Sequence, residues 1–157
     1  MIDAVARRAS AWHRFWALPG ADRRLVLRLF LLLPAVAAGI RILGVRRLCS
    51  FLSGRLSAPS PGAGPDVARA RELGRLVGAV AGRIPGRPAC LTCSITLWYL
   101  LQRRGLPAEV RLGVRTAEGP FQAHAWVECG GEVLNDEQDV GKLFAVFEKL
   151  NLDSSGE

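Results

Sequence analysis

The sequence predicts an α+β fold, in which helices pack against an antiparallel sheet. Two segments with helical periodicity begin at Asp66 and Cys90. Two segments of strict apolar and polar alternation follow, at residues 108–115 and 121–129, and Gly130-Gly131 then turns the chain into a third short strand. Because helices precede a run of strands joined by short connections, an α+β arrangement is favoured.

The N-terminal third of the chain is predicted to be helical. Residues 1–16, rich in arginine and tryptophan, favour a short and loosely held helix. Asp22 is suited to cap a helix that runs to about Leu33, and Pro34 is suited to begin a second helix that ends near Leu52.

A stretch rich in proline, glycine and serine at residues 57–65 predicts a linker. We therefore expect an N-terminal helical region at residues 1–56, used for packing or for docking a partner. The second domain is expected at residues 66–157.

The apolar stretch at residues 25–45 raises the question of whether the chain spans a membrane. Their longest uncharged run, residues 29–40, has twelve residues and contains Pro34. A spanning helix needs roughly 20 apolar residues, so a buried helix pair or a docking surface is the expectation. Arginine and tryptophan flanks leave peripheral membrane contact open.

Charge is divided unevenly along the chain. Residues 1–115 hold nineteen arginines and five acidic residues, a net charge of +14, whereas residues 116–157 carry −7. A basic half suits an acidic peptide, a nucleic acid or a membrane surface as partner, although arginines can also simply solvate helix faces. Aromatic residues interleaved with arginines are sparse outside residues 12–16, which argues against nucleic acid.

The four cysteines are too few for a disulfide scaffold in a chain of 157 residues. The first twenty residues lack the apolar core of a secretory signal, so a cytoplasmic location is expected.

The elements of the C-terminal domain follow in order. The helix after Asp66 is amphipathic, and residues 84–88, with two prolines, end it. The next helix runs from Cys90 to about Arg104, with Gly105 just past its end. After the three strands, residues 140–150 predict a closing helix. The apolar face of the first helix consists of Val67, Ala70, Leu73, Leu76, Val77 and Val80.

Cys90 is the candidate nucleophile, because it stands at the first turn of a predicted helix. The unpaired N–H groups and the dipole at a helix start stabilise an anion, and a thiol reacts as its thiolate. A buried cysteine without chemical function is the alternative at this stage. Cys93 makes the pair a CxxC, but the sequence lacks both the strand that precedes a thioredoxin-like motif and a second half for a zinc site.

His124 is the candidate base. In the strand at residues 121–129 it shares a face with Gln122, Trp126 and Glu128, away from the apolar face. Because Gln122 and Glu128 are polar, a catalytic histidine is favoured over a buried histidine whose hydrogen bonds are all made within the core. Gln122 and Trp126 flank it and are expected substrate contacts.

A catalytic histidine needs a carboxylate or amide to orient it, and Asp136, Glu137 and Asp139 are available. A two-residue turn at Gly130-Gly131 would place Glu137 opposite His124, and a three-residue loop would place Asp136 there. The pattern alone leaves both open.

Four motifs together resemble the leader peptidase of lasso-peptide maturation, a transglutaminase-like protease with a papain-like fold. They are Cys-Leu-x-x-Ser at residues 90–94, LLQRRG at 100–105, VRLGVR at 110–115, and FQAHAWVE at 121–128 followed by Asn135-Asp136. The resemblance covers residues 84–137 and includes the arginine-rich N-terminal helices. It implies Cys90 as nucleophile, His124 as general base and acid, and Asp136 as the orienting carboxylate. It therefore favours the three-residue loop. Cys93 departs from it, because the family commonly has arginine there.

The resemblance also implies a reaction and partners. The expected activity is hydrolysis of the leader–core bond of a ribosomally made precursor peptide through a thioester. Because residues 1–56 are predicted to be helical, without a winged-helix-like leader-binding unit, a separate leader-binding protein (the recognition element of such pathways) is expected as partner. The lasso cyclase is a further candidate partner. We expect neither a metal nor another cofactor, and no phosphate-binding glycine loop is present.

Two other classes of function remain at this stage. One is a non-catalytic transglutaminase-like binding module whose basic half holds a partner. The other is a thiol oxidoreductase that uses Cys90 and Cys93. Selective alkylation of Cys90 and the activity of a Cys90→Ala variant separate these from a peptidase.

Overall fold

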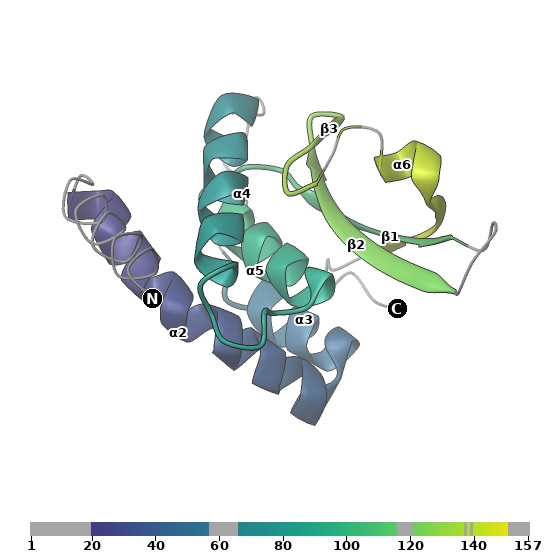
Figure 1. The fold of residues 1–157 in the computed structure, drawn as a ribbon. Coiled ribbons are helices and arrows are strands. Elements are labelled where there is room, and N and C mark those ends of the chain that lie inside the picture. Colours follow the sequence, from purple (N-terminus) through teal and green to yellow (C-terminus); the bar gives the residue numbers. More distant parts are fainter. Residues whose placement is uncertain (1–19, 57–65, 116–120, 137, 139, 151–157) are drawn as a thin grey trace, which may run out of the picture.

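The helices within residues 20–102 form one layer of the protein, and a curled antiparallel sheet with one short helix beside it forms the other (Figure 1). The computed structural model describes residues 20–56, 66–115, 121–136, 138 and 140–150. The four-stranded sheet has the order β3-β2-β1-β4, and the α+β prediction is confirmed. The elements are α2 (Gly20–Leu43), α3 (Val45–Ser53), α4 (Val67–Ala81), α5 (Cys90–Gln102), β1 (Glu109–Arg115), β2 (Gln122–Cys129), β3 (Glu132–Val133), α6 (Val140–Leu143) and β4 (Ala145–Leu150).

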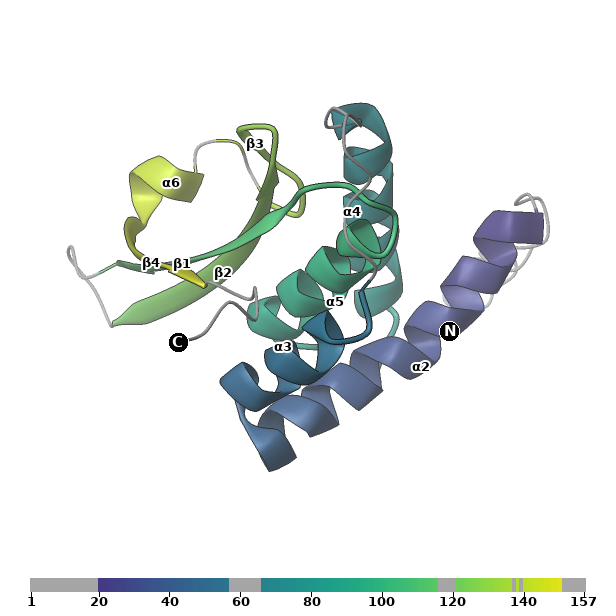
Figure 2. The same ribbon diagram turned by 180° about the vertical axis from the view of Figure 1, so that it is seen from behind.

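Pro34 lies inside α2 and does not begin a new helix, so the predicted boundary there is wrong. A proline inside a helix removes one backbone hydrogen bond, but contacts on both sides of it hold this helix together, since Leu33 and Val36 are buried. The helix ends instead before Gly44, which has a φ of 77°. Glycine adopts this positive φ easily because it has no Cβ to clash with the backbone. From there α3 folds back along α2 (Figure 2).

Helix α2 carries apolar side chains on its exposed side as well as on its buried face. Leu25, Val26, Leu29, Leu33 and Val36 are buried, whereas Leu27, Phe30, Leu31, Ile42 and Leu43 are exposed. By length and composition alone its residues 23–43 are apolar enough to cross a membrane. Only 22% of this apolar stretch is buried in the protein. The sequence predicted a buried pair of helices here, but the stretch is buried along one face only.

One hydrophobic core joins the helices on both sides of residues 57–65. It contains side chains of α2 and α3 together with those of α4, α5, β1 and β2. Helix α4 begins as predicted, since the Asp66 carboxylate accepts a hydrogen bond of 3.0 Å from the Arg69 N–H. The predicted helix at residues 1–16 and the predicted linker lie outside the described residues, and the division into two domains stays a prediction.

The β2–β3 hairpin has a two-residue turn, so the three-residue loop is wrong. Cys129 pairs with Glu132, and Gly130 and Gly131 have φ values of 60° and 81°. Positive φ at both positions matches a type I′ turn, which suits the twist of a hairpin.

The segment predicted as a last helix is mostly strand. Helix α6 stops at Leu143, and Ala145–Leu150 forms β4, which pairs antiparallel with β1. The sequence VGKLFAVFEKL is short and apolar enough to fit either period. The otherwise unpaired edge of β1 offers backbone hydrogen bonds that favour the strand.

Gly74 sets how closely α4 approaches the segment that follows β3. A Cβ at residue 74 would lie 2.3 Å from the Leu134 carbonyl oxygen, whereas a Cβ at Gly78 would meet nothing within 4 Å. We expect Gly74→Ala to lower the free energy of unfolding by about 1–3 kcal/mol. Gly78→Ala, on the same helix, should raise it by up to about 1 kcal/mol. Urea unfolding of both variants tests this, and equal stabilities would contradict the close packing.

Candidate active site

Cys90 is the first residue of α5 and is partly exposed. The preceding Ala89 is extended, with φ −60° and ψ 154°, and no side chain caps the helix. The first intrahelical bond of this turn runs from the Cys93 N–H to the Ala89 carbonyl at 3.1 Å. The N–H groups ahead of it are therefore placed to receive an anion.

His124 and Asp136 form the second part of the site. The Asp136 carboxylate accepts a hydrogen bond from His124 Nε2. Both side chains are about one quarter exposed, at 25% and 26%. A carboxylate at Nε2 fixes the tautomer that carries its proton there, so Nδ1 is the nitrogen that can exchange a proton with a thiol.

Asp136 reaches His124 because the β2–β3 ladder stops early. The Leu134 N–H still donates to the Val127 carbonyl at 3.0 Å. The Val127 N–H, however, donates to the Asn135 side-chain oxygen at 2.8 Å. From Asn135 onward the backbone has left the strand, which frees Asp136 from the alternation that a continued ladder would impose. The resemblance implied Asp136 beside His124, and that contact is present, whereas the three-residue loop inferred from it is wrong. Glu137 and Asp139 lie outside the described residues.

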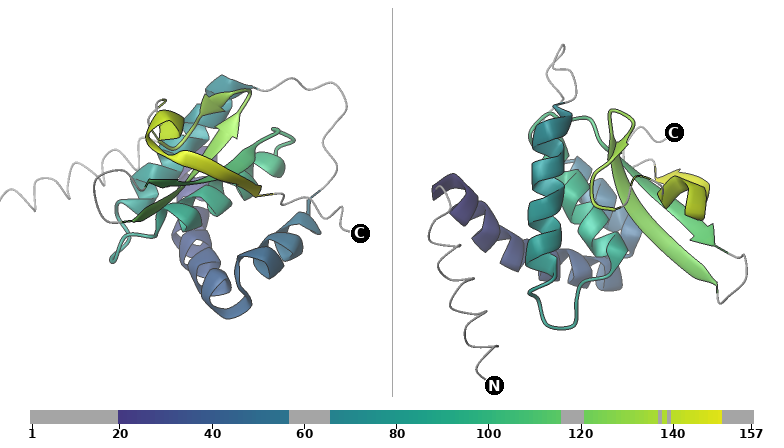
Figure 3. Two further views of the ribbon diagram at one scale, coloured as in Figure 1. Left: turned by 90° about the vertical axis from the view of Figure 1, so that its right-hand side faces the viewer. Right: turned by 45° about the horizontal axis from the view of Figure 1, so that its top comes forward.

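Helix α5 and strand β2 hold Cys90 and His124 on neighbouring segments. Ser94, one helical turn after Cys90, donates a hydrogen bond of 3.0 Å to the carbonyl of Ala125, the residue after His124. Residues four apart on a helix share a face. The start of α5 therefore faces β2 close to His124. Two further views show α5 and β2 as neighbouring segments (Figure 3).

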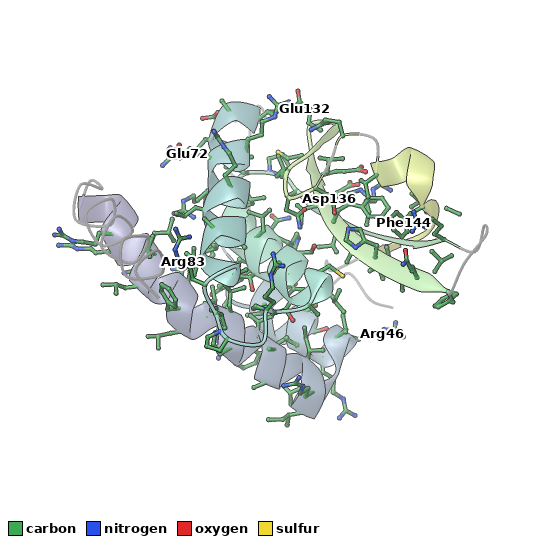
Figure 4. All side chains as sticks on the ribbon, in the orientation of Figure 1. Arg46, Glu72, Arg83, Glu132, Asp136 and Phe144 are labelled. Carbon is green, nitrogen blue, oxygen red and sulfur yellow. The ribbon has the colours of Figure 1, made fainter. Side chains whose placement is uncertain are left out.

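Phe144 is a site residue that the sequence did not reveal. Its ring stacks on the His124 ring, with centroids 5.1 Å apart, and also lies 6.5 Å from the Trp126 ring. Figure 4 labels Asp136 and Phe144, which approach the β2 region from the segments after β3 and after α6. Because residues 140–150 were predicted as a helix, nothing in the pattern aimed Phe144 at this strand.

Gly113, in β1, makes room for that ring. It pairs with His124 in the β1–β2 ladder. A Cβ there would lie 2.8 Å from the Cβ of Phe144 and 2.9 Å from the Trp126 ring. The bare backbone at residue 113 thus lets Phe144 rest against the imidazole.

The two predicted substrate contacts differ in exposure. Trp126 is fully buried, and its indole N–H donates to the Glu128 carboxylate at 2.9 Å. It therefore packs beneath the site, and a direct substrate contact does not agree with its burial. Gln122 is exposed and accepts a hydrogen bond of 2.6 Å from Arg115, so its role stays a prediction.

The other three cysteines are poor nucleophiles. Burial raises the pKa of Cys49 to about 11. Burial, and secondarily Cys90, raise the pKa of Cys93, whose thiol lies 3.9 Å from the Pro88 carbonyl. Burial also raises the pKa of Cys129, with smaller effects from Asp66 and Glu132. All four are free thiols, and no group of three or more potential metal ligands occurs among the described residues.

Iodoacetamide at neutral pH should therefore modify Cys90 first. The raised pKa values leave less thiolate at Cys49, Cys93 and Cys129, and burial shields Cys49 and Cys129 as well. Peptide mass spectrometry over time gives the four rates. Cys93→Ser serves as the control and should leave the Cys90 rate within about twofold. Faster labelling of Cys93 than of Cys90 would contradict the assignment of Cys90 as the reactive thiol.

Comparison with known proteins gave two matches. A model of the transglutaminase-like superfamily matches residues 32–149. The microcin J25-processing protein McjB of Escherichia coli is 39% identical over 61 residues, which is 39% of this chain and 28% of that protein. The match thus spans less than a third of the relative's length, and no solved structure matches significantly. The chain belongs to the transglutaminase-like superfamily.

Proposed function

We propose that this protein is a cysteine peptidase that removes the leader from a lasso-peptide precursor. The observation that carries the proposal is the His124–Asp136 pair on the segments that face the start of α5, where Cys90 stands. Similarity to a protein named for processing microcin J25 supports the substrate class. The cytoplasm, a reducing compartment, would keep Cys90 as a thiol.

The first half of the reaction forms a thioester. His124 Nδ1 takes the Cys90 proton, and the sulfur attacks the carbonyl carbon at the leader–core junction. The N–H groups at the start of α5 would stabilise the oxyanion that forms. Protonated His124 then gives its proton to the leaving amine of the core, and the C–N bond breaks.

The second half releases the leader. His124, neutral again, takes a proton from water as that water attacks the thioester carbonyl. The C–S bond breaks, the leader leaves with a new carboxylate, and the sulfur regains a proton. Asp136 remains ionised throughout and stabilises the imidazolium that appears in each half.

Replacing the three residues should therefore have graded effects. Cys90→Ala should reduce kcat/KM for precursor cleavage by at least about 10⁴-fold. His124→Ala should cost a similar factor, and Asp136→Asn roughly 10²–10⁴-fold because the tautomer is no longer fixed. Mass spectrometry of precursor incubated with enzyme and leader-binding protein measures this.

The control for that series is Cys93→Ser, which should cut at a rate near that of the wild type. Cleavage by Cys90→Ala would refute the peptidase. Full loss in Cys93→Ser would instead bring the thiol pair into the chemistry, as an oxidoreductase requires. Binding of a partner without any cleavage by the wild type would favour the non-catalytic module.

The partner that presents the leader would dock at the opposite end of α5. A groove of about 490 Å³ lies between α2 and the last turns of α5, with an apolar floor that includes Leu31, Leu32 and Tyr99. Arg28, Arg103 and Arg104 line it as well. Burial, followed by the nearby Arg69, Arg103 and Arg28, lowers the pKa of Arg104. A crowded group of like charges beside an apolar floor fits an acidic, amphipathic surface of the leader-binding protein.

Reversing charge in the groove should weaken that complex. The double variant R103E/R104E should raise the Kd for the leader-binding protein at least about tenfold. The variant R46E/R47E changes charge equally on α3, whose residues do not line the groove, and should leave the Kd unchanged. Calorimetry at low and moderate salt measures both. Equal losses would refute the groove, and loss of binding to phosphatidylglycerol vesicles alone would assign it to a membrane surface.

A further inference from the structure

One side-chain amide connects the three segments that carry the candidate triad. The Asn135 oxygen accepts from the Val127 N–H at 2.8 Å. Its amino group donates to the Ser94 hydroxyl oxygen at 3.0 Å. The Ser94 hydroxyl in turn donates to the Ala125 carbonyl at 3.0 Å, and Ser94 is fully buried.

Each end of this chain of bonds lies next to a triad member. Ser94 is one helical turn after Cys90, Ala125 follows His124, and Asn135 precedes Asp136. Moving any one of the three segments would stretch at least one of the bonds. Since the groups are wholly or partly buried, breaking a bond leaves a polar atom without compensation from water.

The directions of the bonds require an amide. The Ser94 hydroxyl proton is committed to Ala125, so its oxygen can only accept from residue 135. Aspartate has nearly the shape of asparagine and could still accept from Val127, but it would set a carboxylate oxygen against the Ser94 oxygen. Asn135→Asp therefore removes the hydrogen-bond donor of residue 135 while nearly keeping the shape of its side chain.

We infer that Asn135 is a positioning residue for the triad, acting with Ser94 to set the distance between the start of α5 and the His124–Asp136 pair. This inference rests on the proposed peptidase function. Asn135 does not touch the reacting atoms; it acts through the segments that it joins.

The test follows the thiol and the reaction separately. We would measure the rate of Cys90 alkylation by iodoacetamide from pH 5 to 9, and kcat and KM for precursor cleavage. In the wild type, the alkylation rate of Cys90 should depend on His124, the proposed base. Asn135→Asp and Ser94→Ala break the same contact from its two ends. Each should move the acid limb of the alkylation profile upward by about one pH unit.

The same two variants should lower kcat about 100-fold, with little change in KM. Gln138→Ala is the matched control, because its amide donates to the Val133 carbonyl in the same region without reaching α5 or β2. It should resemble the wild type. All rates are taken well below the melting temperature of each variant, and the second variant serves if one does not fold.

The outcomes distinguish the inference from the function beneath it. A wild type that does not cut precursor, and in which Cys90 reacts no faster than Cys93, would refute the proposed function. An active wild type with Asn135→Asp and Ser94→Ala like Gln138→Ala would overturn only the positioning role. Lower kcat with an unshifted alkylation profile would also overturn it, since that pattern reports general loosening of the structure.

Discussion

The site depends on the point at which strand pairing stops between β2 and β3. If the ladder had continued past Val133, its register would set Glu137 opposite His124, and Asp136 would point to the other face. Asn135 prevents this by placing its side-chain oxygen where the next backbone acceptor would lie. A side-chain oxygen thus takes the place of a backbone acceptor, and the strand ends there. Asp136 then turns toward the imidazole, and the Asn135 amide joins the segment after β3 to α5.

What the sequence could predict was local in origin. The start of α5 at Cys90 and the face of β2 that carries His124 follow from periodicity and from the residues that begin and end each element. The hairpin register did not, because two adjacent glycines permit more than one turn. Phe144 did not either, because β4 exists only through its pairing with the edge of β1. At Pro34 the local preference of proline for a helix start predicted a boundary that does not exist, because packing along α2 outweighed that preference.

In the proposed function, helix α5 would link chemistry at one end to recognition at the other. Cys90 stands at the positive end of the helix dipole, and Arg103 and Arg104 follow at the negative end, where cations are favoured. Thirteen residues make a rod about 20 Å long. An extended peptide covers that span with roughly six residues. If the proposed partner docks at the arginine groove, the leader that it presents would need a short stretch of fixed length to bring its last bond to the thiol.

Gly113 restricts how this protein can vary. The Phe144 Cβ and the Trp126 ring both come within 3 Å of where a side chain at residue 113 would begin. Each position alone tolerates little, because a larger residue at 113 displaces the ring against His124 and a smaller one at 144 leaves a hole beside it. Every residue at 144 except glycine keeps the Cβ that lies 2.8 Å from this point, and the Trp126 ring lies 2.9 Å from it. A smaller side chain at 144 would therefore not make room at residue 113, and functional variants should keep glycine at this position of β1.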